Sequence, residues 1–117
     1  APGTRINPDT PPQSIMLPGA NTTIAVVAVN AVLDKAEAHR VALMAQDGFA
    51  RAIRPVHTPF DGDTVFVLAT GVRSIRGPAD LARLGSLAAD CLARAIARGV
   101  YAARDLGALQ SYRSLWG

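Results

Sequence analysis

The stretches that decide the fold are TTIAVVAV, at residues 22–29, and DTVFVLAT, at residues 63–70. Both are short and rich in β-branched residues, which is typical of β-strands. In each stretch apolar residues occupy both alternating sets of positions, so neither face of the strand is polar. The sequence therefore predicts two strands, each covered on both faces.

Two helices are predicted around the second strand. The first covers residues 34–53, where Asp34 and Glu37 match a capping box and Pro55 ends the helix. The second covers about residues 79–103. The residues expected to be buried are Val41, Met44, Ala45, Gly48, Phe49, Ala52 and Ile53 in the first helix, and Leu81, Leu84, Ala88, Leu92, Ala95, Ile96 and Gly99 in the second. A tail with Tyr112, Leu115 and Trp116 is expected to pack as a latch.

The resulting order, β-α-β-α, predicts an α/β fold with an incomplete sheet. Two strands alone form a sheet of marginal stability with open edges. Two helices cannot cover both faces of both strands. We therefore expect the chain to be one part of a larger layered α/β assembly that supplies the missing strands.

Composition narrows the class of protein. Half of the 117 residues are hydrophobic and 18% are charged, which argues against disorder. The basic residues form no stripe and few aromatic residues accompany them, so we expect no nucleic-acid partner. No apolar run is long enough for a membrane span and no secretory signal is visible, so a cytoplasmic location is expected. The single cysteine, Cys91, is expected to be packed and inert.

Residues 1–21 differ from the rest of the chain. Five of the eight prolines lie in the first 20 residues, which predicts an irregular linker. The linker ends where the hydroxyl residue Thr22 enters the first strand. Taken alone, Thr22 is an ordinary strand start, and only its wider context makes it a candidate nucleophile. The domain boundary is accordingly expected between residues 21 and 22.

A second candidate group is Asp61-Gly62-Asp63, which follows His57 and comes just before the second strand. The two carboxylates could orient a nucleophile, or bind a divalent cation together with His57 as in a metal-dependent transferase. An Asp-Gly turn is the simpler interpretation. We expect neither a metal nor another cofactor.

Three spaced motifs together resemble one family. They are NTTIAVVA at residues 21–28, AQDGFARAIRPVHTPFDGDTVFVLATG at residues 45–71 and SYRSLW at residues 111–116. They resemble the self-processing N-terminal-nucleophile amidohydrolases, which include the L-aminopeptidase/D-esterases, the β-aminopeptidases and the nylon-oligomer hydrolases. The resemblance covers residues 21–116 and implies an αββα sandwich, in which this chain is the smaller one beside a larger N-terminal chain.

The resemblance also implies the site residues. The precursor would cleave itself between Asn21 and Thr22, and Thr22 would become the nucleophile of the smaller chain. Asp61 and Asp63 match the acidic pair of the nylon-hydrolase branch, whereas the peptidase branch more often has Ser and Glu there. The substrates implied are nylon (6-aminohexanoate) oligomers or N-terminal amino-acid amides and peptides, and the assembly implied is a homo-oligomer of processed pairs.

The chemistry of a freed threonine fits this role. A hydroxyl group needs a base before it can attack a carbonyl, and a free α-amino group with a pKa of about 7.7 to 8 could serve as that base. An alternative is a catalytically silent structural subunit of the same fold. The metal-dependent transferase that uses Asp61 and Asp63 is a further alternative.

Overall fold

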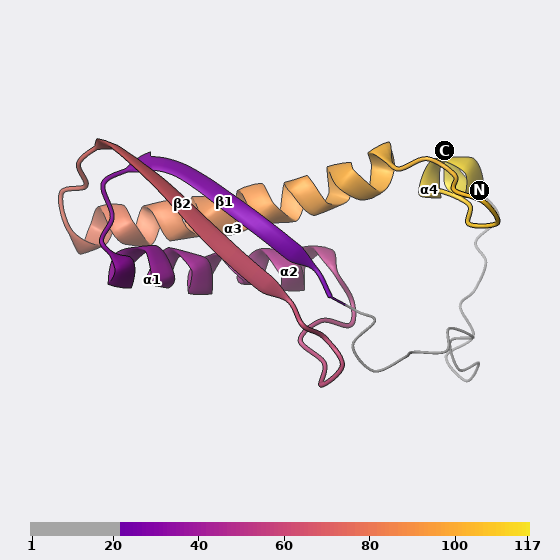
Figure 1. The fold of residues 1–117 in the computed structure, drawn as a ribbon, viewed down its shortest axis with the longest axis horizontal. Helices are drawn as coiled ribbons and strands as arrows, with labels where there is room; N and C mark the ends of the chain where they lie inside the picture. Colours follow the sequence, from indigo (N-terminus) through magenta and orange to yellow (C-terminus); the bar gives the residue numbers. More distant parts are fainter. Residues whose placement is uncertain (1–21) are drawn as a thin grey trace.

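The computed structural model describes residues 22–117. The described elements follow the predicted β-α-β-α order and end in a short extra helix (Figure 1). They are β1 (Ile24–Ala31), α1 (Lys35–Ala45), α2 (Asp47–Ala52), β2 (Thr64–Arg73), α3 (Pro78–Ala102) and α4 (Tyr112–Trp116). Both strands therefore begin and end slightly later than predicted.

The first predicted helix begins as expected but is divided in two. The Asp34 carboxylate accepts a hydrogen bond from the Glu37 amide at 2.8 Å, and the Glu37 side chain accepts from the Asp34 amide at 2.9 Å, which completes the capping box. The single helix over residues 34–53 is wrong, because α1 ends at Gln46 and α2 follows directly. In α2, Gly48 packs so closely on α3 that a Cβ there would lie 2.6 Å from the Ala89 carbonyl oxygen.

The two strands are parallel neighbours, with Ile24 opposite Thr64 at one end and Val29 opposite Ala69 further along. The helices α1, α2 and α3 form one layer against one face of this sheet (Figure 1). Because alternate side chains point to opposite faces, each strand places half of its apolar residues toward the helices. The other half faces outward.

The covered face holds the core. The fully or nearly buried cluster is Val41, Ala45, Phe49, Ala88 and Leu92, and the sheet residues packed on it are Ala25, Val27, Val65 and Val67. Most of the predicted core is therefore confirmed. Three of its members are wrong, since Ala52, Ala95 and Gly99 are exposed. Ala52 closes the short helix α2, Ala95 borders a groove between α3 and β1, and Gly99 lies near the C-terminal end of α3.

The outer face of the sheet is open in this chain. Its large side chains are Ile24, Val26, Phe66 and Leu68, all more than half exposed. Within residues 22–117, the helices cover one face of the strands and the other face stays exposed. The prediction that both faces are covered is therefore confirmed for one face only. A groove of about 250 Å³ runs along the unpaired edge of β1, between residues 26–29 of that strand and one side of α3.

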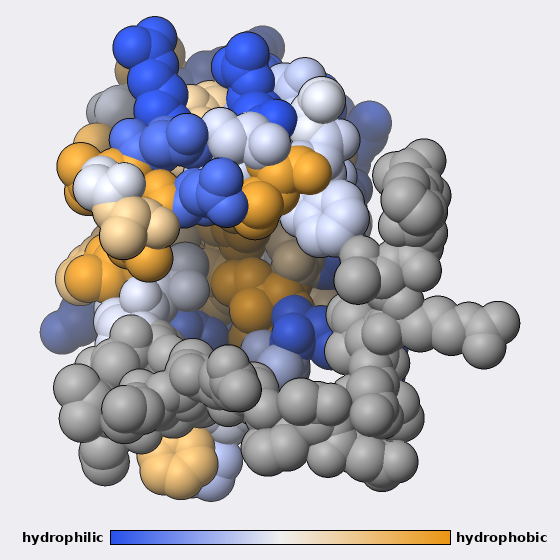
Figure 2. Space-filling view, turned by 90° about the vertical axis from the view of Figure 1, so that its right-hand side faces the viewer, coloured by the Kyte–Doolittle hydropathy of each residue, from blue (hydrophilic) through white to orange (hydrophobic). Residues whose placement is uncertain are grey.

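The C-terminal segment forms a separate small lobe at the far end of α3. The α4 helix lies next to Tyr101, whose ring is 6.4 Å from that of Tyr112 and 5.4 Å from the Arg113 guanidinium carbon. Figure 2 views the molecule from this end, where hydrophobic and hydrophilic side chains are interleaved. The predicted latch is looser than expected, because Tyr112, Leu115 and Trp116 each remain about half exposed.

The environment of Cys91 differs from the predicted one. Cys91 is exposed and borders the groove beside β1, so the prediction of a packed thiol is wrong. Among the helices of residues 22–117, none is long and apolar enough to cross a bilayer.

Candidate active site

Parallel pairing brings the candidate residues together. Because β1 and β2 run in the same direction, their N-terminal ends lie side by side at one end of the sheet. The residues that precede Ile24 in β1 are therefore neighbours of the residues that precede Thr64 in β2. This places Thr22 and Thr23 beside the Asp61-Gly62-Asp63 segment, although about 40 residues separate them in sequence.

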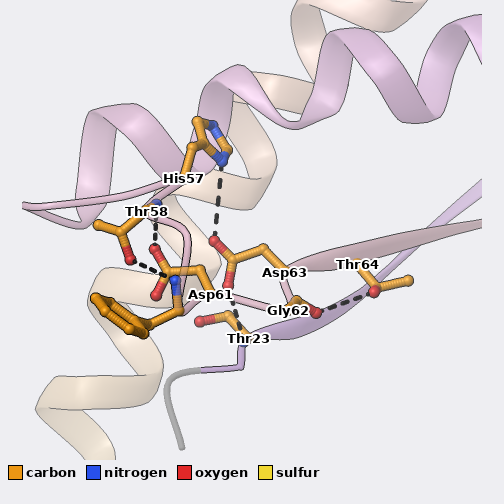
Figure 3. A network of polar contacts seen from close by, with 8 residues as sticks. Thr23, His57, Thr58, Asp61, Gly62, Asp63 and Thr64 are labelled. Atoms are coloured by element: carbon orange, nitrogen blue, oxygen red, sulfur yellow. Dashed lines mark hydrogen bonds and ion pairs between the residues drawn. The ribbon is translucent and has the colours of Figure 1, made fainter. Parts of the chain in front are cut away.

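Asp63 fixes the entrance to β1 (Figure 3). Its Oδ1 accepts a hydrogen bond from the Thr23 amide at 3.0 Å. The Thr23 carbonyl oxygen in turn accepts from the Thr64 amide, also at 3.0 Å. Both backbone polar groups of Thr23 are thus bound to residues 63–64, which fixes the residue that follows the candidate nucleophile. The Asp63 side chain is only 7% exposed.

Thr22 itself is exposed and lies against the glycine of the acidic segment. The nearest atoms to a Cβ built at Gly62 all belong to the Thr22 side chain, and the closest is its hydroxyl oxygen. The hydroxyl group therefore lies beside Gly62, at the N-terminal end of the two strands. Asn21, the other residue of the predicted cleavage bond, lies outside the described residues.

Asp61 has a different neighbour from Asp63. Its Oδ2 accepts a hydrogen bond from the Thr58 amide at 2.7 Å, and its own amide donates to the Thr58 carbonyl oxygen at 3.0 Å. These contacts close a turn from Thr58 to Asp61, one residue before the Asp-Gly position of the simpler interpretation. The two carboxylates were expected to act as a pair, yet in this conformation they bind different segments.

His57 connects the site to the core. Its Nδ1 lies 3.9 Å from Asp63 Oδ2, and its ring meets that of the fully buried Phe49 edge-on, with 6.5 Å between centroids. His57 also has a positive φ of 56°, a conformation that few non-glycine residues adopt. Residues held in such conformations are often found at functional sites. From the sequence, His57 is a possible base, a possible metal ligand or a structural residue of its loop. Its contact with Asp63 could not be predicted, since that contact depends on the loop path.

A metal site is not evident in this arrangement. Within residues 22–117, no three His, Cys, Asp or Glu side chains gather closely enough to hold a metal ion. Asp61 is bound to the Thr58 amide, and Asp63 to the Thr23 amide. The described geometry thus favours backbone positioning by both carboxylates.

Comparison with known proteins gives the context of the site. A profile of peptidase family S58 matches residues 3–113. An uncharacterized aminopeptidase of Mycobacterium tuberculosis and one of Mycobacterium bovis are each 46% identical to the chain over 107 residues. Each alignment covers 82% of this chain and 31% of the relative, and a Mycobacterium leprae relative gives similar values with 30% of its length covered. The chain thus spans about a third of the length of these curated relatives.

The family match includes the two regions that form the site, residues 22–23 and 57–64, and continues upstream across the bond between Asn21 and Thr22. It agrees with the resemblance seen in the three spaced motifs. The chain belongs to peptidase family S58, the L-aminopeptidase/D-esterase family.

Proposed function

We propose that this chain carries the nucleophile of a self-processing hydrolase that acts on amide or peptide bonds, and that Thr22 is this nucleophile. The observation that carries the proposal is the position of the Thr22 hydroxyl group, which lies against Gly62 at the N-terminal end of the two strands. The next residue, Thr23, is fixed by the hydrogen bond from its amide to Asp63. Membership in a peptidase family and the aminopeptidase names of the relatives support the same reaction class.

The proposed reaction has two stages. First, Thr22 Oγ attacks the carbonyl carbon of Asn21, the peptide nitrogen leaves, and water hydrolyses the resulting ester. This step frees the Thr22 α-amino group, which then lies next to its own hydroxyl group. In the second stage the amine accepts the hydroxyl proton while Oγ attacks the substrate amide, and water hydrolyses the acyl-enzyme.

Asp63 has a defined part in this mechanism. Its buried carboxylate accepts from the Thr23 amide and so fixes the direction in which the chain leaves Thr22. Asp61 would stabilise the loop that carries both aspartates, because its carboxylate accepts a hydrogen bond from the Thr58 amide. Residues 1–21 would be the linker that self-cleavage releases from residues 22–117. The residues that stabilise the oxyanion would come from outside this chain.

The proposed partner is a larger N-terminal chain from the same precursor. The open sheet face and the groove beside β1 offer this partner an apolar surface on a chain that spans about a third of its relatives. Strands or helices of the larger chain would cover that surface and complete an αββα sandwich. Processed pairs would then associate into a homo-oligomer in the cytoplasm.

The proposed substrates are small amides. N-terminal amino-acid amides and peptides fit the names of the relatives, while the Asp61 and Asp63 pair favours the nylon-oligomer branch. The substrate pocket would be formed largely by the larger chain. A panel of L-, D- and β-amino-acid amides and linear 6-aminohexanoate oligomers, given to the complete protein, would assign the class.

The decisive experiment replaces Thr22 in the complete protein. Thr22→Ala should prevent self-cleavage and reduce amide hydrolysis at least about a thousandfold, because no other group supplies both nucleophile and base. Mass spectrometry of the wild-type small chain should give an N-terminus of Thr-Thr-Ile-Ala. Full activity with an intact bond between Asn21 and Thr22 would contradict the proposal.

The same measurements separate the alternatives. A silent structural subunit would show neither self-cleavage nor turnover in the wild type. A metal-dependent transferase that uses Asp61, Asp63 and His57 would lose its activity to a chelator and keep it in the Thr22→Ala variant.

A further inference from the structure

The Asp61-Gly62-Asp63 segment contains a glycine whose missing side chain faces the candidate nucleophile. A Cβ built on Gly62 would lie 2.8 Å from Thr22 Oγ1, 3.6 Å from Thr22 Cγ2 and 3.8 Å from Thr22 Cβ. These three atoms are the nearest to it, and all belong to Thr22. A distance of 2.8 Å between carbon and oxygen is too short for van der Waals contact, so a methyl group at residue 62 and the present Thr22 rotamer exclude each other.

The backbone on both sides of this contact is fixed. Thr23 is bound through its amide to Asp63 Oδ1 and through its carbonyl oxygen to the Thr64 amide, both at 3.0 Å. The Thr64 hydroxyl group donates to the Gly62 carbonyl oxygen at 3.1 Å. Residues 22–23 and 62–64 cannot separate without losing the two hydrogen bonds of the Thr23 backbone. The easiest response to a methyl group at residue 62 is therefore a rotation of the Thr22 side chain.

No other feature of the structure requires glycine at this position. The glycines with positive φ among residues 22–117 are Gly71, Gly77 and Gly107, so the backbone of Gly62 is open to alanine. Gly62 is also exposed, so a methyl group there would not disturb the core. The steric requirement is confined to the side chain of Thr22.

We propose that Gly62 is a positioning residue: its lack of a side chain leaves free the space beside the hydroxyl group of Thr22 in its reactive orientation. This inference rests on the proposed role of Thr22 as nucleophile. The atom that a methyl group at residue 62 would displace is the hydroxyl oxygen, whereas the Thr22 methyl carbon lies at an ordinary contact distance of 3.6 Å. The same requirement for glycine therefore holds when serine replaces threonine at residue 22.

The test uses the complete protein with alanine at residue 62. Gly62→Ala should slow self-cleavage and lower kcat for a small amino-acid amide by about 10- to 100-fold, since a misplaced reacting atom costs rates of this size. The change should fall on kcat rather than KM, because Gly62 is argued to move the nucleophile and not the substrate pocket. The melting temperature should stay near that of the wild type.

The matched control is Gly99→Ala. Gly99 is an exposed glycine within α3, and a Cβ there would have no neighbour within 4 Å, so this variant should process and turn over as the wild type does. A second comparison places Gly62→Ala in a Thr22→Ser background. There the added loss should again be about 10- to 100-fold, since the methyl group displaces the same hydroxyl oxygen.

The results distinguish this inference from the proposed function. If Thr22→Ala is inactive while Gly62→Ala processes and turns over normally, the role of Gly62 is wrong and the nucleophile stands. If Thr22→Ala remains active, the nucleophile itself is wrong. A loss from Gly62→Ala that is confined to the threonine background, or a large fall in its melting temperature, would also overturn the positioning role.

Discussion

The two faces of the sheet are built from the same kinds of residue and meet different surroundings. Val27, Val65 and Val67 point toward the helices and pack on the buried cluster around Phe49. Phe66 and Leu68, on the opposite face of β2, are 56% and 58% exposed. The residues of the open face are larger than those of the covered face. Apolar residues on both faces of a strand therefore indicate burial on both sides without identifying which chain supplies the cover.

The largest effect is expected on the covered face. Phe49 is fully buried between the sheet and α3, so Phe49→Ala should reduce the free energy of unfolding by about 3–5 kcal/mol. Urea denaturation of the complete protein measures this loss. The exposed Phe60→Ala is the matched aromatic control, and a similar loss in both variants would show that the core is placed wrongly.

A medium effect is expected on the open face if a larger chain covers it. Phe66→Ala should then destabilise the complete protein by about 3 kcal/mol, close to the cost at a core phenylalanine. If the face stays open to solvent, the loss should be no more than about 0.5 kcal/mol, as for ordinary surface positions. The same urea measurement, with Val67→Ala on the covered face as reference, decides between a covered and an open face.

The smallest effect is expected beyond both faces, in the C-terminal lobe. The Ser111 amide donates to Asp105 Oδ1 at 2.6 Å, and the Ser114 hydroxyl group donates to the same carboxylate at 2.7 and 2.9 Å. These hydrogen bonds hold the pKa of Asp105 below its usual value, and the bond from the Ser111 backbone amide contributes most. The stabilisation that the Asp105 carboxylate gives to this lobe is therefore complete above the ordinary Asp pKa of about 3.9. It is lost as the pH falls through the lowered pKa.

Acidification should accordingly loosen residues 111–116 while the sheet and its helices stay folded. The amide chemical shift of Ser111, followed from pH 5 to pH 2, should show one titration step. Asp105→Asn should remove that step. A Ser111 shift that does not change with pH, or that changes equally in the Asn variant, would contradict the role of this carboxylate.

Much of the architecture could be predicted from local patterns. The period of apolar residues and the Asp34 capping box gave the element order and the start of the first helix, because both depend on nearest neighbours along the chain. The break at Gln46 could not be predicted in this way, since helical spacing continues through it. The exposure of Cys91, Ala95 and Gly99 was also missed, because the helical spacing of apolar residues does not reveal which positions of a long helix its neighbours cover.

The candidate site shows the same division. The motifs singled out Thr22, Asp61 and Asp63. The contacts of Thr22 with Gly62 and of Asp63 with the Thr23 amide depend on the parallel register of β1 and β2, whereas Asp61 binds the Thr58 amide within its own loop. The backbone conformation of His57 and its approach to Asp63 likewise follow from the path of the loop.

The sequence by itself determined the two strands, the helical stripes between and after them, the incomplete sheet and the family. These properties depend on the order and periodicity of residues along the chain. Only the tertiary structure decided which face of the sheet is covered, how the two aspartates divide their contacts, and that Gly62 lies against the Thr22 hydroxyl group. The contacts of Asp63 with Thr23 and of Gly62 with Thr22 join residues 40 positions apart, and strand register, which no local pattern encodes, sets the distances between them.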